Sequence, residues 1–111
     1  MTRVEITRRD GHILGVAADG HTGFGAEGED IVCAALSSVI QTALLGLLQA
    51  AGLAVDYQVL DQNASLRFEL KGGLDETERL KADMILDTML LGIRDLHENW
   101  SDFIGLTVIE K

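Results

Sequence analysis

The chain has 111 residues, which is enough for one domain with a single core and too short for two. It is 47% hydrophobic and 24% charged, a balance that excludes a disordered chain. Its net charge of −9 argues against direct binding of nucleic acid, because phosphate contacts need a basic surface. The acidic balance fits either a basic partner or ordinary solubility. We therefore expect one domain over residues 1–111 that does not bind nucleic acid directly.

Cysteine usage and apolar stretches bear on the cellular compartment. The chain has one cysteine, which cannot form an internal disulfide, so a reducing cytoplasm is the simplest location. The first residues, 1–7, carry charges where a signal peptide would need an apolar run. The longest apolar stretch, residues 31–48, has the length of a membrane span but is interrupted by serine, glutamine and threonine. We therefore expect a cytoplasmic protein that does not enter a membrane.

The first part of the chain has the pattern of a β-hairpin. Residues 4–6 alternate apolar and polar, which is the periodicity of a strand. Asp10-Gly11 suits a tight turn, and residues 13–18 predict the returning strand. The glycine-rich segment 20–28 is then predicted to be a loop.

A long apolar helix is predicted over residues 30–51. Asp30 is its expected N-cap and Gly52 its expected C-terminal stop. Its apolar residues cover more than one face: Ile31, Val32, Leu36, Val39, Ile40, Leu44, Leu47 and Leu48. A helix of this kind is buried on several sides, and in so small a domain part of that surface can meet a second subunit.

A second hairpin and a second helix follow. Residues 55–59 and 66–70 alternate around the turn residues 61–63. Asp75 and Glu78 resemble a capping box that opens the second helix. The apolar side of this helix is expected to include Leu80, Met84, Ile85, Met89 and Leu96.

A last apolar alternation at Ile104, Leu106 and Val108 predicts the final strand. The predicted order is therefore β-β-α-β-β-α-β. Two antiparallel hairpins with two apolar helices predict an α+β fold of two layers. Its mixed, mostly antiparallel sheet has about five strands and is covered by the two helices.

The residues that point to chemistry lie between Gly20 and Cys33. Cys33 is expected about three positions into the first helix, where free backbone N–H groups and the helix dipole stabilise a thiolate. His21 leads the loop, so its imidazole can approach Cys33 and act as a base. Glycines at positions that include Gly23 and Gly28 allow the loop to open and close around a substrate.

Each of these residues also has a structural interpretation. Cysteine is among the most buried residue types, so Cys33 is either a nucleophile or an inert core thiol. Asp30 either orients His21 or caps the helix. Ser37, one turn after Cys33, either faces the same site or is a small residue that allows close packing.

The remaining candidates do not suggest a cofactor. His12 follows the first turn and is expected to be solvated, and His97 suits the dipole at the end of the second helix. The histidines are scattered and no ligand-spaced pair accompanies Cys33, so no metal is expected. The glycine-rich segment lacks the Gly-Lys-Ser/Thr sequence of a phosphate-binding loop.

The string Gly20-His21, a glycine-containing loop, and then Gly28-x-Asp30-Ile31-Val32-Cys33-Ala34-Ala35 resembles the ribosomal-processing cysteine protease family, called Prp. The resemblance extends over the whole chain. It implies an endopeptidase that removes a short N-terminal extension from a large-subunit ribosomal protein by cutting after aromatic residues.

The same resemblance implies roles for individual residues and a partner. It makes Cys33 the nucleophile and His21 the general base. The implied supporting or substrate-binding residues are Gly20, Gly23, Gly28, Asp30 and Ser37. It further implies a homodimer that acts on a basic ribosomal protein. The alternative is a non-catalytic, dimeric module for protein binding or ribosome assembly, in which Cys33 would be unreactive.

Overall fold

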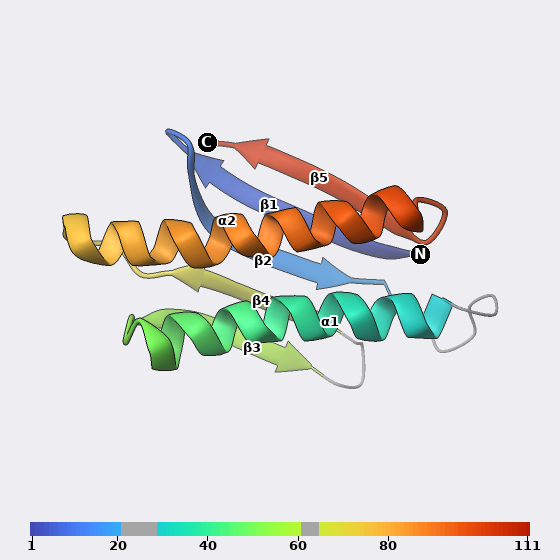
Figure 1. Cartoon of the computed structure of the whole chain (residues 1–111), viewed down its shortest axis with the longest axis horizontal. Helices are drawn as coiled ribbons and strands as arrows, with labels where there is room; N and C mark the ends of the chain where they lie inside the picture. The colour runs from blue at the N-terminus through green and yellow to red at the C-terminus, as the bar shows by residue number, and fades with distance from the viewer. Residues whose placement is uncertain (21–28, 61–64) are drawn as a thin grey trace.

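The computed structural model describes residues 1–20, 29–60 and 65–111, in which two helices lie side by side on one face of a five-stranded sheet (Figure 1). The elements are β1 (Thr2–Arg9), β2 (His12–Asp19), α1 (Glu29–Leu45), the π-helical turn η1 (Gly46–Ala50), β3 (Val55–Leu60), β4 (Ser65–Leu70), α2 (Glu76–Asn99) and β5 (Ile104–Glu110). The prediction of an α+β two-layer domain with this element order is confirmed.

The sheet is mixed, with the strand order β3-β4-β2-β1-β5. Both hairpins are antiparallel, and β5 pairs in parallel with β1. The first hairpin turns at Asp10 and Gly11, whose φ angles of 52° and 81° suit the twist of a tight hairpin. The predicted second turn, residues 61–63, lies outside the described residues.

A row of paired residues on β2, β4 and β3 lies at the end of the sheet from which the chain continues to α1. Ala18 near the end of β2 pairs with Leu66 on β4, and Leu66 pairs with Val59 on β3. The chain leaves β2 at this end, and the N-terminal end of α1 lies there as well (Figure 1). The last turn of α2 is also at this end, because the two helices run in opposite directions.

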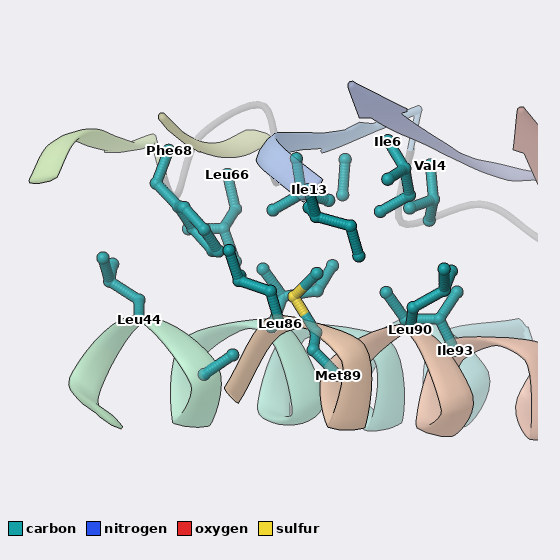
Figure 2. Packing of buried hydrophobic residues seen from close by; sticks show 14 of the residues in the cluster. Val4, Ile6, Ile13, Leu44, Leu66, Phe68, Leu86, Met89, Leu90 and Ile93 are labelled. Carbon is teal, nitrogen blue, oxygen red and sulfur yellow. The ribbon is translucent and has the colours of Figure 1, made fainter. Parts of the chain in front are cut away.

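The core fills the space between the sheet and the helices. In Figure 2, Val4, Ile6 and Ile13 point from the sheet toward Leu86 and Ile93 on α2. All five side chains are at most 1% exposed. Truncating one such leucine or isoleucine to alanine costs about 2–5 kcal/mol of unfolding free energy, because it removes buried apolar area and leaves a cavity. This packing fixes both helices on the sheet.

The first helix begins earlier than predicted. Glu29 is already helical, so Asp30 lies within the helix and is not the N-cap. Both residues are acidic and both suit the first turn of a helix, so the sequence does not distinguish the two starts. The predicted stop is confirmed, because the helical segment ends at Ala50 and Gly52 has a φ of 68°.

The second helix begins as predicted but faces the sheet differently. The capping box is present: Asp75 Oδ1 accepts from the Glu78 amide at 2.8 Å, and the Asp75 amide donates to Glu78 Oε1 at 3.1 Å. Leu80 and Met84, predicted on the apolar side, are each 65% exposed, so that prediction is wrong for both. The residues that α2 buries are Ala82, Leu86, Met89, Leu90 and Ile93.

The segment Ile31–Ala50 is long and apolar enough to cross a membrane by length and composition, with a mean hydropathy of 2.1. In the fold it packs on the sheet beside α2, and 39% of the window is buried. The core helix of a two-layer domain has the same composition. The large exposed part of α1 is considered below.

Candidate active site

Cys33 is the only thiol in the chain and lies near the N-terminal end of α1. Its residue is 7% exposed and the cysteine is free. On the helix it is flanked by Val32, also buried, and is followed one turn later by Ser37, which is half-buried. The i and i+4 positions of a helix share one face, so Cys33 and Ser37 lie on the same side of α1.

The start of α1 at Glu29 changes the surroundings expected for Cys33. Cys33 becomes the fifth helical residue instead of about the third. In the i to i−4 pattern of an α-helix, its amide donates to the carbonyl of Glu29. Its own N–H group is therefore not one of the free amides at the helix end. The helix dipole acts mainly within the first turn, so it stabilises a thiolate here less than predicted.

Gly20 lies at the point where β2 passes into the segment that contains His21. Its φ angle is 101°, a conformation that favours glycine. A Cβ atom built on Gly20 would lie 2.7 Å from the carbonyl oxygen of Met1, which is too close for any side chain. The glycine is thus required by the backbone at the entrance to this segment.

The other predicted site residues are only partly described. His21, Gly23 and Gly28 lie outside the described residues, so the geometry between His21 and Cys33 is not defined. Asp30 is placed in the first turn of α1 by its backbone. Of the seven predicted site residues, the structure brings Cys33, Ser37 and the backbone of Asp30 together on the first turns of one helix.

The His12 side chain is 40% exposed, and its Nδ1 also shares a hydrogen bond of 2.8 Å with Asp83 Oδ2 on α2. The two residues are 71 positions apart, so no local sequence signal could have indicated the pair. His12 therefore links β2 to α2, at the end of the molecule opposite the start of α1.

Edge strand β3 carries two exposed apolar side chains. The sequence analysis used them only as evidence for a strand and did not predict that they belong to a site. Tyr57 and Val59 pair with Phe68 and Leu66, which are both buried on the helix-covered face. Cross-strand partners point to the same face of a sheet, so Tyr57 and Val59 also point to that face. They are nevertheless 51% and 43% exposed. An open apolar strip thus runs along β3 toward the end at which α1 begins.

Among residues 1–20, 29–60 and 65–111, no three His, Cys, Asp or Glu side chains are grouped in a way that would hold a metal ion. The described part of the site is therefore one thiol, one hydroxyl and the backbone of a helix end. A thiol and a nearby base are sufficient for nucleophilic catalysis on an acyl group.

Comparisons with known proteins define the class. A family model described as cysteine protease Prp matches residues 1–105. "Ribosomal processing cysteine protease Prp" of Bacillus subtilis (strain 168) is 25% identical over 107 residues, covering 94% of this chain and 96% of that protein. The protein of the same name from Staphylococcus aureus (strain Mu50) is 30% identical, covering 96% and 97%.

Solved structures agree with these sequence matches. The ribosomal processing protease Prp of S. aureus in complex with a substrate peptide superposes with a TM-score of 0.85 at 28% identity, covering 97% of this chain and 99% of that one. The structure of SMU.848 from Streptococcus mutans superposes with a TM-score of 0.86 at 27% identity, covering 100% and 96%.

The fold, the thiol on α1 and the matches over nearly the whole chain define a cysteine protease. The chain belongs to the ribosomal-processing cysteine protease family Prp. The predicted family and enzyme class are confirmed.

Proposed function

We propose that this protein removes the N-terminal extension of a large-subunit ribosomal protein, with Cys33 as nucleophile and His21 as general base. The proposal is supported by relatives named for ribosomal processing and by the S. aureus Prp structure with a substrate peptide. A second S. aureus Prp structure, with a TM-score of 0.80 and 28% identity, contains a covalently linked product peptide, which fits covalent catalysis.

One observation carries the assignment of the nucleophile. A cysteine protease needs a thiol, and Cys33 is the only cysteine in the sequence. Its position near the N-terminal end of α1 leaves the amides of the preceding turn as the candidate donors to an oxyanion. Cys33 is therefore the only residue of the chain that can form the thioester.

The choice of base is between three histidines. His12 is held by Asp83 at the opposite end of the molecule. His97 lies in the last turn of α2, at the same end as the start of α1. His21 follows Gly20 directly and precedes Cys33 by twelve positions on the segment that enters α1. We therefore assign the base to His21 and use His97 as the comparison.

The proposed reaction has two steps. The Cys33 thiol gives its proton to His21, and the sulfur attacks the scissile carbonyl carbon. The C–N bond then breaks, His21 returns the proton to the leaving amine, and a thioester stays on Cys33. In the second step His21 takes a proton from water, and the hydroxide attacks the thioester carbon. The C–S bond breaks, the carboxylic acid product leaves, and the Cys33 sulfur takes the proton back from His21. No cofactor takes part in this sequence.

The substrate is proposed to bind as an extended chain beside β3. Among the described strands, β3 is an edge strand that pairs only with β4, so its outer N–H and C=O groups can accept another strand. Tyr57 and Val59 provide an apolar strip on the helix-covered face. An extension that contains aromatic residues fits this strip.

The working unit is proposed to be a homodimer in the cytoplasm. Both helices carry large apolar side chains that are exposed, each by 53–75%. They are Ile31 and Leu45 on α1 and Leu80, Met84 and Leu91 on α2. Between the helices is a groove of about 460 Å³ lined by serine, threonine, glycine and apolar residues, with no charged side chain. A second copy that covered this face would bury a surface that water solvates poorly.

A cleavage assay tests the function. The purified protein is incubated with a peptide that spans the extension and the mature N-terminus of the ribosomal protein, and the products are identified by mass spectrometry. Cys33→Ala should lower kcat/KM by more than ~10³-fold and His21→Ala by about 10²–10⁴-fold. His97→Ala should cleave as the wild type does. Cleavage near the wild-type rate by a folded Cys33→Ala variant would overturn the proposal.

A further inference from the structure

A second cavity lies at the opposite end of the molecule from Cys33, where the first hairpin turns and α2 begins. It has a volume of about 310 Å³. Its charged and polar lining comes from the β1–β2 turn, β4, the start of α2 and the C-terminal residue: Arg9, Asp10, His12, Glu69, Arg79 and Lys111. A volume of this size accepts a small ligand.

The cavity collects basic side chains in an acidic protein. Three of the nine lysine and arginine residues of the chain, Arg9, Arg79 and Lys111, line it. Elsewhere Arg8 pairs with Glu110, and Arg67 lies 3.9 Å from Asp56. Within the described residues, the three cavity cations have no ion-pair partner. Two carboxylates, Asp10 and Glu69, also line the cavity, whereas the whole chain has a net charge of −9.

Arg79 provides the sharper observation. Its Nη1 atom is buried and has no hydrogen-bond partner among the described residues. A buried guanidinium N–H without an acceptor costs about 1–3 kcal/mol or more, because burial removes its hydration. Arg79 is in the first turn of α2, where Asp75, Glu76 and Glu78 already complement the helix dipole. The group missing from this position is an acceptor for the Arg79 guanidinium itself.

The polar groups nearest to Arg79 on α2 do not pair with it. His12 Nδ1 and Asp83 Oδ2 share a hydrogen bond of 2.8 Å, and this contact joins the cavity wall on β2 to α2. Asp83 lies one helical turn after Arg79, and its Oδ1 is also buried without a hydrogen-bond partner among the described residues. The Arg79 guanidinium is therefore not used by this carboxylate.

We propose that this cavity binds a phosphate-class oxyanion, either free or as a phosphate monoester, with the Arg79 guanidinium as the principal donor and Arg9 and Lys111 as supporting charges. Guanidinium groups bind phosphate oxygens through paired N–H donors, which suits a fixed arginine better than a lysine. The site is separate from the proposed catalytic residues, so binding and cleavage can be measured independently.

Isothermal titration calorimetry on the full chain tests the proposal, at constant ionic strength with chloride as the balancing anion. One arm uses inorganic phosphate and the other a ribonucleoside 5′-monophosphate. Saturable binding in either arm supports the site, and the tighter arm identifies the source of the phosphate group. Arg79→Gln should weaken binding by about 10–100-fold, as expected for the loss of a charged hydrogen bond.

Two further variants serve as a control outside the cavity and as a second test inside it. Arg94→Gln removes an exposed arginine from the same helix but outside the cavity, and it should bind as the wild type does. Arg9→Gln removes an exposed cation from the lining and should weaken binding by a smaller factor, even if Arg79→Gln fails to fold. The proposal is overturned if neither phosphate compound binds up to ~10 mM, or if Arg94→Gln weakens binding as much as the two cavity variants do.

Discussion

At the scale of single residues, the position of Cys33 decides how its thiol is activated. With α1 starting at Glu29, Cys33 is beyond the first turn and its amide is used within the helix. The dipole and the free amides then contribute less to a thiolate than a cysteine in the first turn would gain. We infer that proton transfer to the proposed base, His21, carries most of the activation.

Gly20 gives a residue-scale prediction about the segment that carries His21. Gly20→Ala should lower the free energy of unfolding by about 1–3 kcal/mol, because its φ of 101° disfavours a side chain and the new Cβ would meet the Met1 carbonyl oxygen at 2.7 Å. Urea unfolding measures the loss, and kcat/KM should fall as well because His21 is the next residue. Gly72→Ala is the matched control, because its Cβ would meet nothing within 4 Å. Equal stability of the two variants would contradict the argument.

At the scale of elements, edge strand β3 is the part of the sheet that we propose meets the substrate. Its last residues share a row with Leu66 and Ala18, at the end where α1 begins. Tyr57 and Val59 are the exposed apolar residues of this strand. They lie on the helix-covered face, whereas the intervening Gln58 points to the opposite face.

This arrangement predicts an effect on substrate binding. Tyr57→Ala should raise KM for the extension peptide several-fold and leave kcat nearly unchanged, because the side chain would bind substrate and transition state alike. Steady-state kinetics with the peptide separate the two constants. Gln58→Ala should leave both unchanged. A fall in kcat with an unaltered KM would show that Tyr57 acts on the chemical step or the fold instead.

At the scale of the whole molecule, the two helices have an inner face that forms the core and an outer face that is also apolar. From Ile31 to Ala50 the chain carries no charged residue, yet only 39% of that window is buried. On α2, Leu80, Met84 and Leu91 are each 65–66% exposed. We propose that a second subunit covers this outer face of both helices.

The dimer proposal predicts a specific sensitivity to charge. Leu91→Glu should weaken self-association by at least about tenfold, because a buried carboxylate without a partner is costly. Sedimentation velocity over a concentration series measures the shift from dimer to monomer. Thr107→Glu places the same charge on an exposed position of β5, next to the outward-facing Glu5, and should leave the association unchanged. A monomeric wild-type protein at all concentrations would exclude the dimer.

The sequence predicts this fold well wherever the signal is local. Strand alternation, the Asp10-Gly11 turn and the capping box of Asp75 and Glu78 each act over a few residues and are all confirmed. The orientation of α2 is not local: the helix is apolar on two faces, so Leu80 and Met84 were placed inward although they point outward. The start of α1 is earlier than predicted, because Glu29 and Asp30 suit the first turn equally.

The candidate site also has features that local sequence predicts and features that it does not. Cys33 could be singled out because it is the only thiol, and Gly20 because it begins the glycine-rich segment. The contact between His12 and Asp83 and the cavity at Arg79 could not be predicted, because they join residues far apart in the chain. The pairing of His21 with Cys33 stays a prediction, since residues 21–28 lie outside the described structure.

Covalent capture tests the central claim most directly. The protein is mixed with a peptide that carries the extension sequence and ends in a chloromethyl ketone, and the intact mass and the modified residue are determined by mass spectrometry. The account predicts one peptide adduct per chain, located on Cys33, forming much more slowly in His21→Ala and at the normal rate in His97→Ala. A preparation that cleaves the ribosomal protein but forms no adduct on Cys33 would contradict it.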